Sequence, residues 1–259
     1  MKKTVDYNLI STEYNKRYSV NSMQGIRSAL VQLRNTYNPK TVLEVGCGTG
    51  RWLTEFDFGK TKIIGMDYSK GMLREASNFE NVSLIRGDAD NLPLKNNLFE
   101  MIYSVNAIHH FKNGLHFVSE SEKHLTDNGF LCIIGLDHHE ERIDWFIYDY
   151  FDGTYEYDKY RFPLFQDISL TMNSAGFINI DIKIIDTVNI TRIGNEIFND
   201  PFLAKMQSSQ LAALSDDEYA KGIEKIKMKI KSNPKQEFKV QFAVKMITGF
   251  TSRSNKILS

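Results

Sequence analysis

The residues best suited to chemistry lie in one short stretch and in one carboxylate that follows it. Residues 42–50 read Val-Leu-Glu-Val-Gly-Cys-Gly-Thr-Gly, an apolar run that ends in closely spaced glycines. Asp67 follows about 20 residues later, at the end of a second apolar run over residues 62–66. Glycines let a ligand approach the backbone, and a carboxylate accepts hydrogen bonds from ribose hydroxyls. The pattern predicts a site for a cofactor that contains a nucleoside.

The glycine spacing distinguishes between cofactors. A dinucleotide turn of the form G-x-G-x-x-G would require glycine in place of Arg51, whereas this chain has G-x-G-x-G. Glu44 stands just before the first glycine, where it would repel a pyrophosphate but attract an ammonium or a sulfonium. A strand-turn-helix of another α/β protein is the alternative. The stretch resembles motif I of the class I S-adenosylmethionine-dependent methyltransferases.

Two later segments extend the resemblance. Residues 64–73 resemble the second motif of the family, and residues 86–94 the third. The resemblance implies that Asp67 accepts both ribose hydroxyls. It also implies that Asp88 accepts the adenine amine, which only an acceptor can recognise. The alternative for Asp67 is a helix cap at the end of a strand.

Residues 104–111 resemble a fourth motif, that of small-molecule methyltransferases. They lie at the carboxyl end of an expected strand, where open α/β sheets bind ligands. No proline occurs in this stretch, which argues against enzymes that methylate nucleobase amines. His110 is the candidate catalytic residue, with a ring packed beneath the cofactor as the alternative. His109 is expected to face away.

The remaining contacts follow from the same resemblance. A backbone N–H at Ala89 would meet an adenine ring nitrogen, while Tyr68 and Met72 would cover the adenine; core packing is the alternative for Met72. Tyr18 belongs to an N-terminal, tyrosine-rich segment that would fold over the cofactor. The predicted cofactor-binding residues are Tyr18, Glu44, Gly46, Cys47, Gly48, Asp67, Tyr68, Met72, Asp88, Ala89 and Asn106.

Strand-like and helix-like segments alternate from residue 40 to residue 135, which predicts a parallel sheet with helical crossovers. The resemblance implies a Rossmann-like α/β fold: a seven-stranded, mostly parallel sheet with helices on both faces and a helical lid. We expect strands at residues 41–45, 62–66, 82–86, 99–105, 129–135, 177–185 and within 238–250, and helices at 50–56, 69–77 and 115–125.

The domain organisation predicted is an N-terminal helical lid segment, residues 1–38, followed by one methyltransferase domain, residues 39–259. An insertion at about residues 189–234 is expected to form part of a cap over the substrate. Its second half starts a helix, because Ser215 and Glu218 form a capping-box pattern. Aromatic or aliphatic residues are frequent in residues 14–23, 144–165 and 195–230, which suits a partly apolar small acceptor.

Composition limits the possible partners. The 259 residues include 32 Lys and Arg and 32 Asp and Glu, so a zero net charge gives no reason to expect a nucleic acid. Two cysteines form no disulfide framework, and no apolar run could span a membrane, which together predict a cytoplasmic protein. Residues 137–141 group acids and histidines, but neighbours on one short loop seldom converge on a metal ion. No metal is predicted.

The sequence thus predicts an S-adenosylmethionine-dependent methyltransferase that acts on a small molecule by in-line displacement. S-adenosylhomocysteine would be the product, and the chain would be a monomer or a homodimer. One alternative is a methyltransferase acting on RNA or protein. Another is a cofactor-binding regulatory protein without catalytic activity.

Overall fold

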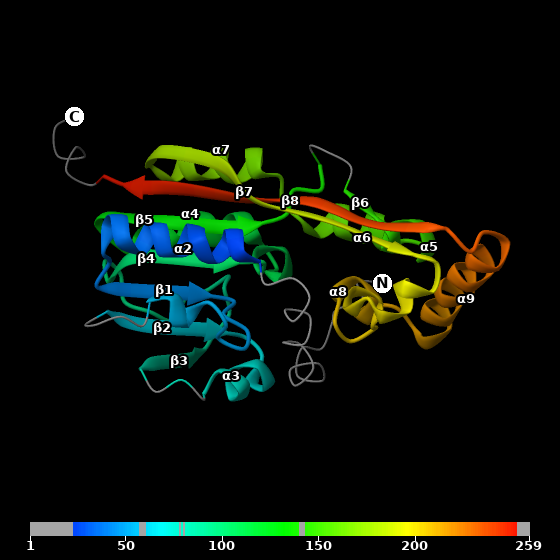
Figure 1. The fold of residues 1–259 in the computed structure, drawn as a ribbon. Helices are drawn as coiled ribbons and strands as arrows, with labels where there is room; N and C mark the ends of the chain where they lie inside the picture. The colour runs from blue at the N-terminus through cyan, green and yellow to red at the C-terminus, as the bar shows by residue number, and fades with distance from the viewer. Residues whose placement is uncertain (1–22, 57–60, 78, 80, 140–142, 253–259) are drawn as a thin grey trace.

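The computed structural model describes residues 23–56, 61–77, 79, 81–139 and 143–252 (Figure 1). A single sheet with strand order β3-β2-β1-β4-β5-β8-β6 forms the centre, and β7 pairs with β8. The strands from β3 to β5 are parallel, and β8 is antiparallel to β5, β6 and β7. The strands are β1 (Thr41–Val45), β2 (Lys62–Asp67), β3 (Val82–Arg86), β4 (Phe99–Val105), β5 (Leu125–Gly135), β6 (Asp144–Trp145), β7 (Phe177–Ile193) and β8 (Glu237–Thr251).

This arrangement confirms the predicted α/β fold with a mostly parallel sheet. The sheet has eight strands instead of the seven expected, because the two-residue strand β6 pairs with the part of β8 that extends beyond β5.

Apolar side chains cover both faces of the sheet, as expected for buried parallel strands. On one face Val42 packs with α2 (Gln24–Tyr37) and the 3₁₀ helix η2 (Leu53–Phe56). On the other face Leu43 packs with α4 (Gly114–His124) and α7 (Phe165–Ala175). Because successive strand residues point to opposite faces, Glu44 lies on the α2 face.

A second lobe is attached to the long two-stranded ribbon formed by β7 and β8, which extends past the parallel strands (Figure 1). Its apolar core is continuous with the cluster on the α2 face of the sheet. Ser215 and Glu218 form the predicted capping box at the start of its longest helix. The lobe contains α5 (Phe146–Tyr150), α6 (Thr154–Arg161), η4 (Gly194–Asn199), η5 (Pro201–Leu203), α8 (Ser209–Ala212) and α9 (Asp216–Ser232).

Three elements differ from the sequence-based expectation. The helix expected over residues 50–56 is a short 3₁₀ helix, in which Leu53 and Phe56 are both fully buried; the three-residue period of that helix places them on one side. The strand expected to end at residue 185 continues to Ile193, because a bulge near Ile185 interrupts the alternation without ending the strand. The inserted segment is therefore residues 194–236.

The third difference lies at the start of β5. The strand expected at residues 129–135 starts earlier, since β5 begins at Leu125. Asn128 adopts a left-handed φ of 63°, and the pairing of β4 with β5 shifts register nearby. The residues just before the expected strand thus form a bulge within it. Within the described residues, no helix is long and apolar enough to cross a bilayer.

Candidate cofactor and acceptor site

The glycine turn follows β1 at the carboxyl edge of the sheet. Gly46 and Gly48 have φ angles of 75° and 55°, a left-handed conformation that favours glycine. The backbone N–H groups of Gly46 and Cys47 donate to the Met66 carbonyl at 2.8 and 3.0 Å, which ties the turn to β2. A Cβ on Gly46 would lie 2.4 Å from Ala107 Cβ, whereas a Cβ on Gly48 would meet no atom within 4 Å. Gly48 therefore faces open space.

Asp67 connects the end of β2 to this turn. Its Oδ2 accepts the Gly48 N–H at 2.8 Å, and its Oδ1 accepts the Ser69 N–H at 2.8 Å. Burial raises the pKa of Asp67, while these backbone bonds oppose the rise. The cap of α3 (Lys70–Ala76) is Ser69, whose hydroxyl accepts the Met72 N–H. Asp67 is thus not the cap of this helix.

Glu44 lies beneath the turn and is only 1 % exposed. Its Oε2 accepts a hydrogen bond from the Tyr103 hydroxyl at 3.1 Å, but its buried Oε1 has no partner among the described residues. Burial raises the pKa of Glu44 well above its usual range, and the nearby Asp67 carboxylate raises it further; the Tyr103 bond opposes this. A cation bound beside these two carboxyl groups would favour their ionised forms.

The residues expected around the adenine lie on the next two strand ends. The Tyr68 side chain is 66 % exposed, whereas Met72 is buried, as core packing requires. Asp88 forms an ion pair with Lys112, and this hydrogen bond lowers the pKa of Asp88. The backbone N–H of Asp90 bonds Asp88 at 3.1 Å. An adenine amine would share this carboxylate with Lys112. Ala89 is buried beside it.

The end of β4 carries Asn106 and the two histidines. Asn106 has a φ of 50°, and its backbone N–H donates to the Ile134 carbonyl at 2.8 Å. Both histidines lie in the 3₁₀ helix η3 (Ile108–His110). The expectation that His109 faces away is wrong, because its ring stacks on Phe162 at 3.8 Å and lines the same cavity as His110.

A buried polar network from the second lobe reaches His110. Asp158 is fully buried, and its Oδ1 accepts both Arg161 Nε at 2.8 Å and Arg161 Nη2 at 2.7 Å. Its Oδ2 accepts the Tyr148 hydroxyl at 2.7 Å. Arg161 Nη1 lies 3.4 Å from His110 Nδ1. Asp158 therefore fixes the guanidinium that contacts the predicted catalytic residue.

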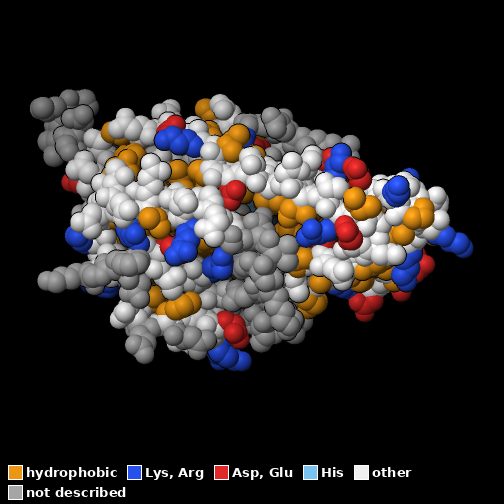
Figure 2. Space-filling model, viewed as in Figure 1, with side chains coloured by type: hydrophobic (Ala, Val, Ile, Leu, Met, Phe, Trp, Pro, Cys, Tyr) orange, Lys and Arg blue, Asp and Glu red, His pale blue; other side chains and the backbone are white. Residues whose placement is uncertain are grey.

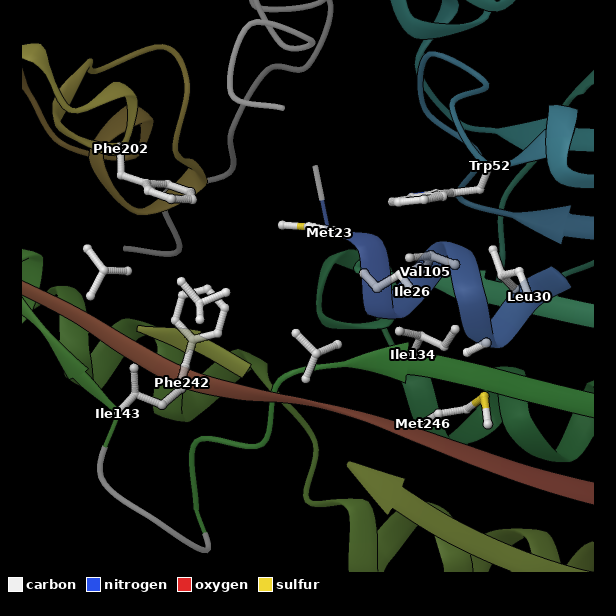
Figure 3. Packing of buried hydrophobic residues seen from close by; sticks show 14 of the residues in the cluster. Met23, Ile26, Leu30, Trp52, Val105, Ile134, Ile143, Phe202, Phe242 and Met246 are labelled. Carbon is white, nitrogen blue, oxygen red and sulfur yellow. The ribbon is translucent and has the colours of Figure 1, made fainter. Parts of the chain in front are cut away.

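A cavity lies between the sheet edge and the second lobe. Its volume is about 70 Å³, and it opens to solvent. Met23, at the start of α2, points toward the space beside Phe202 and Phe242 (Figure 3). Asn106 Nδ2 lies 3.8 Å from Met23 Sδ. The cavity therefore adjoins the sheet edge that carries the predicted cofactor residues.

Some predicted residues do not join this site. Tyr18 and most of residues 14–23 lie outside the described residues, as do residues 140–142. Asp137 accepts the backbone N–H groups of His139 and Phe165, at 3.0 and 3.2 Å. His138 instead contacts Tyr148 at 2.8 Å. No group of three potential metal ligands converges in the described part of the chain.

Sequence reasoning missed several residues in and beside the cavity. Asp158 and Arg161 are spaced i, i+3 on α6, a spacing that could have indicated an ion pair. No comparable pattern marks Gln207, because its place in the cavity lining depends on how the second lobe folds back toward the sheet.

The methyltransferase domain family Methyltransf_25 matches residues 42–129, which include the glycine turn, Asp67, Asp88 and the histidines. The match identifies residues 42–129 as a methyltransferase domain. The demethylmenaquinone methyltransferase of Staphylococcus epidermidis is 31 % identical over 102 residues, which are 37 % of this chain and 39 % of that protein. An uncharacterised methyltransferase of Bacillus subtilis, YcgJ, is 32 % identical over 104 residues, 38 % of this chain and 40 % of YcgJ.

The chain thus spans well under half of these curated relatives' length in sequence. In structure the likeness extends further, since YcgJ superposes with a TM-score of 0.61 over 87 % of this chain and 99 % of YcgJ, at 17 % identity. A Haemonchus contortus phosphoethanolamine N-methyltransferase in complex with S-adenosyl-L-methionine has a TM-score of 0.51 at 18 % identity, covering 83 % of this chain and 49 % of that one. At such identity these two likenesses establish the methyltransferase fold.

Proposed function

We propose that the chain transfers a methyl group from S-adenosylmethionine to a small molecule. The observation that carries the proposal is the pair of carboxylates, Glu44 and Asp67, beside a turn where Gly48 faces open space. The unpartnered Oε1 of Glu44 fits a cationic group, and a pyrophosphate would be repelled there. The chain therefore suits the methionine end of S-adenosylmethionine better than a dinucleotide.

The roles of the binding residues follow from their positions. Asp67 accepts the ribose hydroxyls, and Glu44 accepts the ammonium of the methionine moiety. Asp88 accepts the adenine amine, and the backbone of residues 46–48 lines the turn. Asp67 already holds the Gly48 N–H, so the acid that binds the ribose also fixes the shape of the turn.

S-adenosylmethionine supplies a methyl group on an already activated sulfonium when it is bound. The chain has to orient the acceptor in line and exclude water. An arginine guanidinium can only donate, so the lone pair of His110 Nδ1 faces Arg161 and the proton of the neutral ring lies on Nε2. We infer that His110 positions the acceptor by donating from Nε2.

A small acceptor is favoured over RNA or protein. The cavity lies between the two lobes, and acidic and basic side chains are mixed on the face of the second lobe drawn in Figure 2. Two of the related proteins are named for small acceptors, demethylmenaquinone and phosphoethanolamine. The inserted segment, residues 194–236, would act as a lid, and the chain would work as a monomer or homodimer in the cytoplasm.

Titration calorimetry tests the cofactor assignment. S-adenosylhomocysteine and S-adenosylmethionine are expected to bind, and NAD is expected to give no heat at millimolar concentration. Preferred binding of NAD would replace the proposal. Binding of S-adenosylhomocysteine without methyl transfer to any acceptor in a small-molecule panel would favour the regulatory alternative, and transfer to RNA the macromolecular one.

A further inference from the structure

One edge of the sheet is formed by β7, whose backbone can pair along its outer side. Within the described chain, β7 pairs only with β8, and its 17 residues make it the longest strand there. Edge strands present a row of unpaired N–H and C=O groups to any second strand, and soluble proteins usually keep them short or blunted. An edge of this length is therefore a candidate interface.

Apolar side chains are exposed along this edge. Ile182 and Ile184 are 38 % and 62 % exposed, and Ile178 and Ile193 are exposed as well. The register with β8 shifts on both sides of residues 181–184, so these four residues form a regular stretch between two bulges. A second strand paired with this stretch would bury isoleucines that now face water.

Two opposite charges lie on one face of the same stretch. Lys183 Nζ contacts Asp181 Oδ2 at 2.7 Å, and both side chains are at least half exposed. Alternation along the strand places Ile182 on the other face. An exposed ion pair of this kind adds little stability to the chain by itself. Its charges can instead select the register of a second strand.

The order of these residues is complementary to itself. When two copies pair antiparallel about a two-fold axis perpendicular to the sheet, opposed residues lie on the same face, so the axis passes through a residue position. An axis at Ile182 places each Asp181 opposite the partner's Lys183. An axis at Asp181 or at Lys183 would oppose like charges, which is destabilising.

We propose that the chain forms a homodimer in which β7 of one copy pairs antiparallel with β7 of the other, with the two-fold axis at Ile182. The sheet is then continuous across both copies. The paired stretch is short and charged, so the dimer is reversible and weakens as salt is added. Because β7 lies beyond β8, away from β1 and β2, the interface does not include the cofactor turn.

Sedimentation velocity of the full chain over a concentration series tests the interface. Wild type is expected to dimerise in the micromolar range. Asp181→Lys and Lys183→Asp each oppose like charges across the axis and are expected to weaken dimerisation about 10-fold or more. The double variant with both changes restores opposite charges and should recover the dimer. A monomeric wild type, single variants that dimerise as wild type does, or a double variant as weak as the single ones would each overturn the inference.

Cysteine cross-linking tests the register. Opposed residues of antiparallel strands have Cα atoms about 4.5–5.5 Å apart, within reach of a disulfide, whereas the two copies of residue 184 would lie about 14 Å apart. Ile182→Cys is therefore expected to give a disulfide-linked dimer on oxidation, and Ile184→Cys, the matched control, is not. The native Cys47 and Cys132 are buried. Equal cross-linking of the two variants, or of neither, would contradict the register.

Calorimetry with S-adenosylhomocysteine separates this inference from the proposed function. Asp181→Lys is expected to bind the cofactor product as wild type does, because the interface lies away from the turn. Cofactor binding by a chain that never dimerises would refute only the dimer, and a dimer that binds no cofactor would refute only the proposed function.

Discussion

Replacing Glu44 with glutamine is expected to stabilise the ligand-free protein and to weaken cofactor binding. The carboxylate is 1 % exposed, and one of its oxygens lacks a partner in the described chain. Leaving a buried polar atom unpaired costs about 1–3 kcal/mol, and more when it is charged. Glutamine keeps the shape and an acceptor for Tyr103 but removes the charge. For a chain of this size we expect the melting temperature to rise about 2–4 °C per kcal/mol gained.

The pH dependence gives this prediction a defined sign. Burial raises the pKa of Glu44 in the folded state above its ordinary value of 4.5. Between the unfolded and folded pKa values, the folded state binds more protons, so wild-type stability falls as the pH rises. The advantage of Glu44→Gln should therefore be small in acid, where both states are protonated, and grow toward neutral pH.

Cofactor binding should change in the opposite direction. Loss of the charged acceptor removes about 1.5–3 kcal/mol, which weakens S-adenosylhomocysteine binding about 10- to 150-fold. Thermal melts across the pH range and calorimetry at neutral pH measure the two effects. Glu100→Gln is the control, because Glu100 holds the Lys40 N–H at the other end of β4. A Glu44→Gln variant that binds the cofactor as wild type does, and melts no higher at neutral pH, would refute the reasoning.

Three further predictions concern the ribose, the buried network and the lid. Asp67→Ala is expected to weaken S-adenosylhomocysteine binding about 10- to 150-fold, and Tyr68→Ala much less, because only the acid supplies a charged acceptor; equal calorimetric affinities for Asp67→Ala and wild type would show that the ribose lies elsewhere. Asp158→Asn is expected to cost about 3–5 kcal/mol in urea unfolding at neutral pH. Burial raises the pKa of Asp158, but bonds from a histidine and an arginine lower it, and the net shift is downward. The stabilisation from Asp158 is therefore present above its unfolded-state pKa and is lost as the pH falls through its folded-state pKa. A stability deficit of Asp158→Asn that stays unchanged in strong acid would contradict this. Hydrogen exchange should show protection of residues 195–230 when S-adenosylhomocysteine binds, and protection confined to residues 42–110 would mean that the inserted segment is no lid.

The elements that carry the cofactor motifs could be predicted from sequence because their signals are local. The apolar run of β1 with its glycines and the Ser69 cap of α3 are set by neighbouring residues. The same holds for the capping box at Ser215, whose partner is three residues away. Strand ends were less predictable, since the bulge near Ile185 depends on pairing with β8.

The sequence by itself thus determined where the parallel strands lie along the chain and which residues surround the glycine turn. The tertiary structure alone decided which side chains meet across the cavity. Arg161, on α6, meets His110, on η3, and Trp145 and Gln207 line the same cavity from separate segments. These contacts depend on where the ribbon of β7 and β8 places the second lobe, and no local pattern of residues encodes that placement. The environment of Glu44 is likewise decided by packing, because the residues that bury it and raise its pKa are distant in the chain.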